Sequence, residues 1–180
     1  MKKIPTMFKR NLENMQEVLD EPHPDCLWVC NGEGVATRKY DGTCCKVENG
    51  KFYKRREVKN GKNAPDDFVE EMQDVNTGNR VGWVPVSETN ENKYHLEAFG
   101  DGLPDGIYEL VGPKIQGNPE NYGSHILIDI SSATEYQDAP RSFDALREWL
   151  ADKDIEGIVF HHPDGRMAKI KKRDFGLKRI

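Results

Sequence analysis

The apolar residues of this 180-residue chain fall in short segments separated by turn residues, and this pattern limits the folds open to it. Asn49-Gly50 is the strongest signal for a two-residue hairpin turn. Strands are predicted over 28–57, 83–86, 94–99, 106–111 and 125–130, and in a final hairpin at 157–160 and 167–171. Because the strands are joined by hairpins rather than βαβ units, the chain is expected to be α+β with largely antiparallel sheets.

Few helices are expected. Near-helical spacing of apolar residues predicts a short helix over 7–19. The polar stretch 59–82 is predicted to be a mobile surface excursion with a short helix at 67–73. An amphipathic helix is expected after Ser142, which would cap it, with Asp144 in the first turn.

Composition excludes some classes of protein. With 26 basic and 31 acidic residues, a formal charge of -5 argues against coating nucleic acid through bulk positive charge. No apolar run approaches the ~20 residues that cross a membrane, and the start lacks the apolar core of a signal peptide. The cysteines lack paired CxxC spacing, so reduced thiols in a cytoplasmic protein are expected, with a zinc site as the alternative. They are Cys26, Cys30, Cys44 and Cys45.

The tetrapeptide Lys39-Tyr40-Asp41-Gly42 is a candidate site because of the residues predicted to lie beside it. A two-residue turn at Asn49-Gly50 would pair Cys45 with Lys54. Lys54 and Arg56 share a strand face and would project beside the end of the Lys39 loop. An exposed basic strand is the alternative interpretation.

The last hairpin predicts a second convergence. A two-residue turn within Pro163-Asp164-Gly165 would place Glu156 on the same face as Lys169 and Lys171. The opposite face would carry Val159, Ala168 and Ile170. A three-residue loop would break this alignment, and a surface strand with a modest ion pair is the alternative. Phosphates require several cations and divalent metals require oxygen ligands, so these groups suit nucleotide chemistry.

The order of these motifs resembles the collinear motifs I, Ia, III, IV and V of ATP-dependent ligases and capping enzymes. The motifs are Lys39-Tyr40-Asp41-Gly42, Lys54-Arg55-Arg56, Tyr108-Glu109, Glu156-Gly157-Ile158-Val159 and Lys169-Ile170-Lys171. The strings 36–45 and 109–114 most resemble RNA ligases, particularly the family that includes a vertebrate 5′–3′ RNA ligase. The resemblance covers residues 28–175 and implies a nucleotidyltransferase (ATP-grasp-like) fold. A single adenylyltransferase domain over 1–180 is expected, without an OB-fold or other C-terminal domain, because only a few residues follow motif V.

The resemblance also implies a covalent mechanism. Lys39 would attack the α-phosphate of ATP and form lysyl-AMP with release of pyrophosphate. Its ammonium must first lose a proton, and the ordinary pKa of lysine is ~10.4. Lys169 and Lys171 would lower that pKa by like-charge repulsion and then neutralise the phosphate. The AMP would pass to the 5′-phosphate of an RNA end, and a 3′-hydroxyl would displace it to repair the strand.

Further roles follow from the same resemblance. Asp41, Glu109 and Glu156 match positions that hold the waters of the catalytic Mg²⁺ (or Mn²⁺), and Glu109 also matches a ribose contact. Arg56, or alternatively Arg55, matches a residue that binds phosphate or the incoming end. One of the adjacent cysteines is expected to pack inward, the other to face the nucleotide pocket. The basic tail would offer a small RNA surface through Lys169, Lys171, Lys172, Arg173, Lys178 and Arg179.

Some alternatives stay open. Arg38 precedes the nucleophile where several relatives carry glutamate, so adenine recognition is not determined. A DNA ligase or a GTP-using capping enzyme is the enzymatic rival, and the RNA-ligase-like strings count against both. The rival from another class is a non-catalytic nucleotide- or RNA-binding module derived from a ligase. The presence of Lys39 counts against it, because binding alone does not require a nucleophile. A minimal ligase could also require a domain supplied in trans.

Overall fold

The computed structural model describes residues 2–179 and divides into two compact units. The central unit contains Asp41–Ser132 together with the first residues of the chain, up to Lys3. The terminal unit contains Ile4–Tyr40 and the chain from Ala133 onward. Each unit has its own antiparallel sheet and its own hydrophobic core. The α+β class with mostly antiparallel sheets is thereby confirmed.

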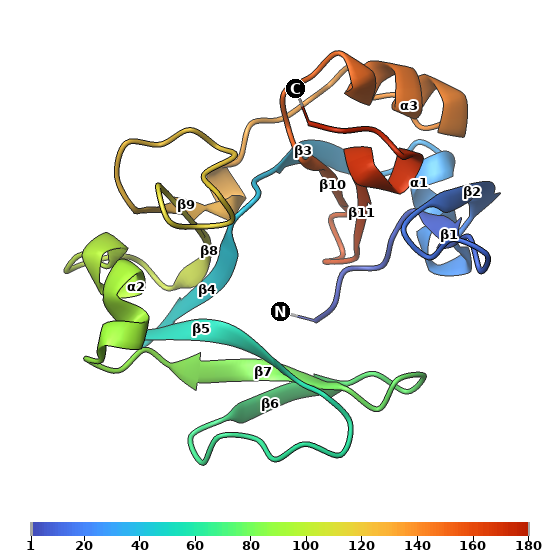
Figure 1. The fold of residues 1–180 in the computed structure, drawn as a ribbon. Coiled ribbons are helices and arrows are strands. Elements are labelled where there is room, and N and C mark those ends of the chain that lie inside the picture. Colours follow the sequence, from blue (N-terminus) through green and yellow to red (C-terminus); the bar gives the residue numbers. More distant parts are fainter. Residues whose placement is uncertain (1, 180) are drawn as a thin grey trace. The chain divides into compact units, whose positions relative to one another are not determined.

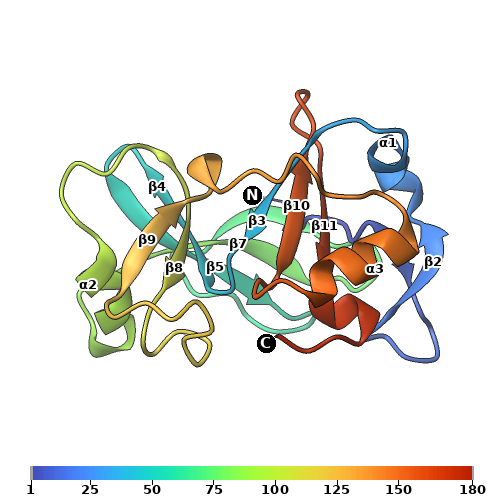
Figure 2. The ribbon, with the colours of Figure 1, turned by 90° about the horizontal axis from the view of Figure 1, so that it is seen from above.

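The sheet of the terminal unit has the order β11-β10-β3 (Figures 1 and 2). Its strands are β3 (Val35–Lys39), β10 (Gly157–His161) and β11 (Met167–Lys171). Single bridges extend it at both edges, where Thr6 pairs with Lys169 and Glu135 pairs with Thr37. Segments far apart in the sequence therefore form one continuous surface.

Helices and a small hairpin pack around this sheet. They are β1 (Phe8–Arg10), β2 (Val18–Pro22), η1 (Pro24–Cys26), α1 (Leu27–Cys30), α3 (Phe143–Ala151) and η4 (Lys172–Phe175). Leu146 and Leu150 of α3 pack with Ile158 and Ile170, and all four are fully buried. One face of the sheet thus forms the core of the terminal unit. Among residues 2–179, no helix has the length and apolar character needed to cross a membrane.

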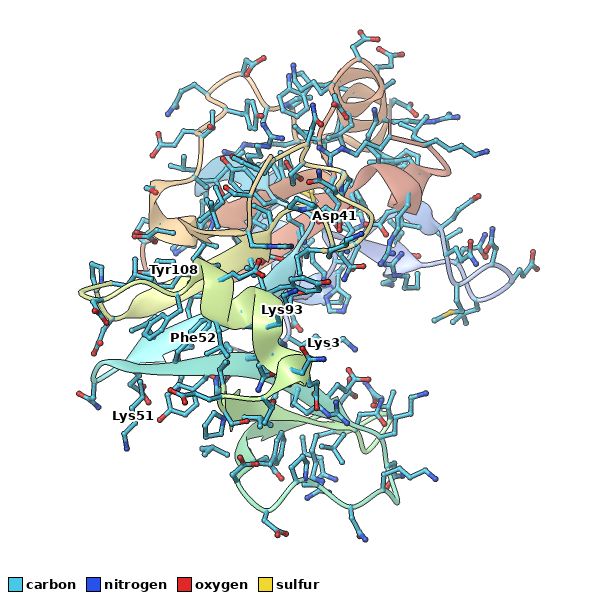
Figure 3. All side chains as sticks on the ribbon, turned by 60° about the vertical axis from the view of Figure 1, so that its left-hand side comes forward. Lys3, Asp41, Lys51, Phe52, Lys93 and Tyr108 are labelled. Atoms are coloured by element: carbon cyan, nitrogen blue, oxygen red, sulfur yellow. The ribbon has the colours of Figure 1, made fainter. Side chains whose placement is uncertain are left out.

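The central unit contains a six-stranded antiparallel sheet of order β6-β7-β5-β4-β8-β9. Its strands are β4 (Thr43–Glu48), β5 (Lys51–Val58), β6 (Val69–Gln73), β7 (Arg80–Pro85), β8 (Gly106–Val111) and β9 (Ile126–Asp129), and its short helices are η2 (Asn90–Asn92), α2 (Lys93–Ala98) and η3 (Ile130–Ser132). Residues of α2 pack against the buried side chains of Phe52 and Tyr108 (Figure 3). The rings of Phe52 and Phe99 stack with centroids 4.6 Å apart.

Several local predictions are confirmed. β4 and β5 form the expected hairpin, with Cys45 opposite Lys54. Asn49 and Gly50 have φ values of 52° and 71°, as a turn that matches the twist of the strands requires. The strands at 106–111 and 126–129 and the helix after Ser142 are present, although the Ser142 side chain forms no capping hydrogen bond.

The helix predicted over 7–19 is wrong. The segment forms β1, a loop and β2, and only its two ends are buried. Leu12 and Met15, which supplied the helical spacing, are 85% and 60% exposed. The side chains of Asn11 and Asn14 accept hydrogen bonds from backbone amides two residues ahead. Such local bonds favour turns over a helix, and here they determine the conformation.

Three other assignments are wrong. The helix predicted at 67–73 is strand β6, which pairs with β7. The strand predicted at 94–99 falls largely in helix α2, where Tyr94 and Ala98 pack on the same core. Their spacing of four residues suits a helix face. The strand predicted from Trp28 begins only at Val35, after the short helix α1.

Candidate active site

Lys39 and Lys171 lie on either side of a glycine in the sheet of the terminal unit. Gly157 of β10 pairs with Lys39 of β3 and with Lys171 of β11. Directly opposite residues share a sheet face, so both lysines project on the same side. A Cβ atom on Gly157 would lie 2.2 Å from the carbonyl oxygen of Ile170, so the close approach of β10 and β11 requires glycine here.

Glu156 joins the two lysines. Its Oε2 lies 2.5 Å from Nζ of Lys39, and its Oε1 lies 2.6 Å from Nζ of Lys171. The side chains of Lys39, Glu156 and Lys171 are only 21%, 12% and 12% exposed. Burial by itself would raise the pKa of the Glu156 carboxyl, but the two ammonium groups hold that pKa below its usual range. The carboxylate therefore stays ionised and fixes both cations.

Lys169 adds a third cation to this face. It lies two residues before Lys171 and opposite Val159. Burial and the charges of Lys171 and Lys39 lower the pKa of Lys169 to about 8, against the opposing effect of Asp174 and Glu156. The terminal unit thus brings together four predicted site residues, with three lysines around one glutamate.

The prediction for the last hairpin is wrong in its register. Residues 162–166 connect the strands, rather than a two-residue turn, so Val159 lies on the same face as Lys169 and not on the opposite one. Ala168 and Ile170 do face the core, as expected. Glu156 still reaches Lys171, because it immediately precedes the glycine that pairs with that lysine.

Lys169→Met is expected to raise the free energy of unfolding at pH 7 and to change its pH dependence. The pKa of Lys169 is about 8 in the folded protein and about 10.5 when unperturbed, so between these values the unfolded chain binds more protons. Lys169 therefore makes the free energy of unfolding rise with pH from about 8 to 10.5. Below pH 8 the lysine is charged in both states, and the full cost of burying its charge lowers the stability of the folded protein. The variant should lose that rise.

Urea unfolding of wild type and Lys169→Met at pH 7, 8, 9 and 10 would measure the effect. The exposed Lys178→Met serves as the control and should leave the pH profile unchanged. An identical rise in the wild type and in Lys169→Met would show that Lys169 titrates normally.

The other predicted residues lie in the central unit, around the turn that follows Lys39. The backbone amide of Gly42 donates a hydrogen bond to Oε1 of Glu109 at 3.1 Å. The amide of Asp41, labelled in Figure 3, donates to Oε1 of Glu120 at 2.9 Å. Two carboxylates thus hold consecutive amides. Glu120 was not found from the sequence, because it lies 79 residues away in a loop without periodicity.

Arg55 and Arg56 lie on opposite faces of the central sheet. Cys44 pairs with Glu109, and the charge and hydrogen bonding of Arg55 act on the Cys44 thiol, so these three side chains are neighbours. Burial and Glu109 nevertheless raise the pKa of Cys44 to about 11. Arg56 pairs with Gly82 and is exposed on the face that carries Lys54. Side-chain alternation separates the two arginines, and the pairing of β4 with β8, which the sequence leaves undefined, places Glu109 on the face of Arg55.

The adjacent cysteines also face opposite ways. Cys45 is fully buried in the core of the central unit, as expected for one of the pair. Cys44 lies on the side of Glu109. All four cysteines are free thiols. Within the part of the chain that the structure describes, no three His, Cys, Asp or Glu side chains are gathered to hold a metal ion, which leaves the zinc alternative without support.

The predicted basic tail is wrong for Lys172. This side chain is buried, and its ammonium donates to the carbonyl oxygens of Ala151 at 3.2 Å and Lys153 at 2.7 Å. It therefore binds the end of α3 rather than facing solvent. Arg179 forms an ion pair with Asp154.

Comparison with known proteins gives relatives over most of the chain. No protein-family model matches it. It is 26% identical to RNA ligase 1 of Danio rerio, with 98% of this chain and 81% of that protein aligned. RNA ligase 1 of Pongo abelii is 25% identical and that of Rattus norvegicus 28%, each over 79% of this chain and 67% of the relative. These vertebrate proteins support an RNA-ligase-like family for this chain.

Proposed function

We propose that this protein is an ATP-dependent RNA ligase with a nucleotidyltransferase fold, which forms lysyl-AMP at Lys39 and joins 5′-phosphate to 3′-hydroxyl RNA ends. The observation that carries the proposal is the bridge of Glu156 between Lys39 and Lys171, with Lys169 on the same face. A structural ion pair requires only one lysine. Three lysines around one carboxylate provide a nucleophile and surplus positive charge for a phosphate.

The first step forms a phosphorus–nitrogen bond. Nζ of Lys39, once deprotonated, attacks the α-phosphorus of ATP, and the bond to the pyrophosphate oxygen breaks. Glu156 orients Nζ before attack, because the two are already in contact. Lys171 and Lys169 then balance the negative charge that develops on the α-phosphate oxygens.

The family resemblance implies a divalent ion, and the acidic residues that it names suit this role. Asp41, Glu109 and Glu156 offer carboxylate oxygens, the ligand type that Mg²⁺ and Mn²⁺ prefer. Held through water by these residues, the ion would neutralise phosphate charge and favour departure of pyrophosphate. Glu109 would also accept a hydrogen bond from the ribose.

Two further steps complete the proposed cycle. The 5′-phosphate of an RNA end attacks the phosphorus of lysyl-AMP and releases Lys39, and the 3′-hydroxyl of a second end then displaces AMP. Arg55 is our preferred ligand for the incoming phosphate, in place of Arg56, because it lies beside Cys44 and Glu109. A further protein domain acting in trans would position the RNA ends.

The test measures labelling of the protein by ATP or GTP and then compares the sealing of nicked RNA with that of nicked DNA. The protein is incubated with Mg²⁺ and ATP or GTP carrying ³²P at the α-position, then resolved on a denaturing gel. Labelling from ATP but not GTP, followed by sealing of nicked RNA but not nicked DNA, is the expected result. GTP labelling would favour a capping activity, and sealing of DNA alone a DNA ligase. No label from either nucleotide would leave the binding module as the better account.

A further inference from the structure

One face of the sheet in the terminal unit carries Lys39, Lys169 and Lys171, and its charge differs from one end of the strands to the other. Three successive rows cross the face, each contributed by β3, β10 and β11. The rows are Lys39-Gly157-Lys171, Thr37-Val159-Lys169 and Val35-His161-Met167. Positive charge is confined to the first two rows, and the side chains farther along β3 and β10 are uncharged or apolar.

Thr37 and His161 form a hydrogen-bonded pair within this part of the face. Oγ1 of Thr37 lies 2.9 Å from Nε2 of His161 and 3.4 Å from the carbonyl oxygen of Val159. Both side chains are partly exposed. Burial lowers the pKa of His161, so its ring is neutral at pH 7 and carries one donor and one acceptor nitrogen. The Thr37 hydroxyl can also donate and accept.

The polar but uncharged side chains of Thr37 and His161 suit a nucleobase better than a phosphate. Val159 pairs with Thr37 and precedes His161 by two residues on the same face, so the hydrogen-bonded pair is flanked by an apolar side chain that is 7% exposed. The nearest cation on the face is Lys169, opposite Val159. The single bridge to Thr37 adds the exposed carboxylate of Glu135 at the outer edge, which would repel a phosphate.

The spacing along the strands also fits a nucleotide. Thr37 lies two residues from Lys39, roughly 7 Å along the strand, and His161 lies four residues from Gly157, roughly 13 Å. A nucleotide whose α-phosphate meets Lys39 and Lys171 can therefore extend its base along β3 and β10.

We propose that Thr37 and His161 bind the edge of the nucleobase of the nucleotide that reacts with Lys39, and that they favour adenine. The inference rests on the proposed covalent chemistry and adds the determinant of base choice. Adenine presents an amino donor beside a ring-nitrogen acceptor, and a neutral imidazole with a hydroxyl supplies the complementary acceptor and donor.

The test compares ATP with purine riboside triphosphate, which lacks the 6-amino group. Rates of covalent nucleotide formation are measured for the wild type, Thr37→Val and His161→Phe. The wild type is expected to prefer ATP by about tenfold, since a polar group that the bound base covers and leaves without its partner costs about this much. The variant that removes the acceptor of the 6-amino group should lose about tenfold with ATP and little with the analogue. The variant that removes the donor to the ring nitrogen should slow both nucleotides, because the analogue keeps that nitrogen.

Thr134→Val is the matched control. It makes the same substitution at an exposed position. Thr134 directly precedes Glu135, so its side chain points to the opposite face from Thr37. It should keep the preference for ATP. A preference for ATP that stays unchanged in both Thr37→Val and His161→Phe would overturn the inference while leaving the covalent chemistry intact. The absence of any adduct in the wild type would overturn both.

Discussion

Lys39→Arg is expected to abolish the covalent nucleotide, lowering label incorporation from ATP by at least ~10³-fold. The substitution retains a positive charge beside Glu156, so the ion pair of the folded protein persists in altered form. It removes the nucleophile, because a guanidinium does not lose its proton in proteins. Loss of label then reports chemistry rather than loss of charge.

Lys46→Arg provides a matched control for this experiment. Its side chain is 18% exposed, close to the 21% of Lys39, and it also pairs with a glutamate, Glu48. It should incorporate label as the wild type does. Persistent label in Lys39→Arg, displaced by pyrophosphate, would mean that another residue carries the nucleotide.

Arg10→Met is expected to lower the free energy of unfolding by about 3 kcal/mol, because it leaves a buried carboxylate without its cation. Asp174 is fully buried, and its Oδ1 lies 2.7 Å from Nη1 of Arg10. The other oxygen accepts the backbone amide of Lys171 at 2.9 Å. An unpaired charge at this position costs its desolvation penalty without compensation, and it also loosens the end of β11.

Urea unfolding measures this effect, with Lys9→Met as the control. Lys9 forms an ion pair with Glu21 in the same hairpin, but its side chain is 41% exposed and that of Glu21 is 55% exposed. The control should change stability by no more than about 0.5 kcal/mol. Adding Asp174→Leu to Arg10→Met should recover part of the loss. Equal effects of Arg10→Met and Lys9→Met would show that the Asp174 pair contributes no more than a surface pair.

Label incorporation by Arg10→Met should fall as well, under conditions where the variant remains folded. Asp174 holds the backbone of Lys171, and Lys171 contacts Glu156. Arg10 therefore acts through Asp174 as a positioning residue. Full activity with reduced stability would confine the pair to a structural role.

The sequence determined the features that depend on short stretches of chain. The alternation of residues in strands and the turn at Asn49-Gly50 predicted antiparallel pairing, and the register of Cys45 opposite Lys54 followed. The meeting of Glu156 with Lys171 was also predicted, although through the wrong turn length. Such features rest on dihedral preferences and on side-chain alternation, which act within a few residues.

Tertiary structure decided what local preferences leave undetermined. Leu12 and Met15 have helical spacing, yet the fold leaves them exposed in a loop, because Phe8 and Val18 supply the core contacts of that hairpin. The pairing of β8 with β4 placed Glu109 opposite Cys44, and therefore beside Arg55 rather than Arg56. The contacts of Arg10 with Asp174 and of Thr37 with His161 join residues 164 and 124 positions apart. No periodicity encodes such contacts, because they form only when distant strands are brought into register by the burial of apolar side chains.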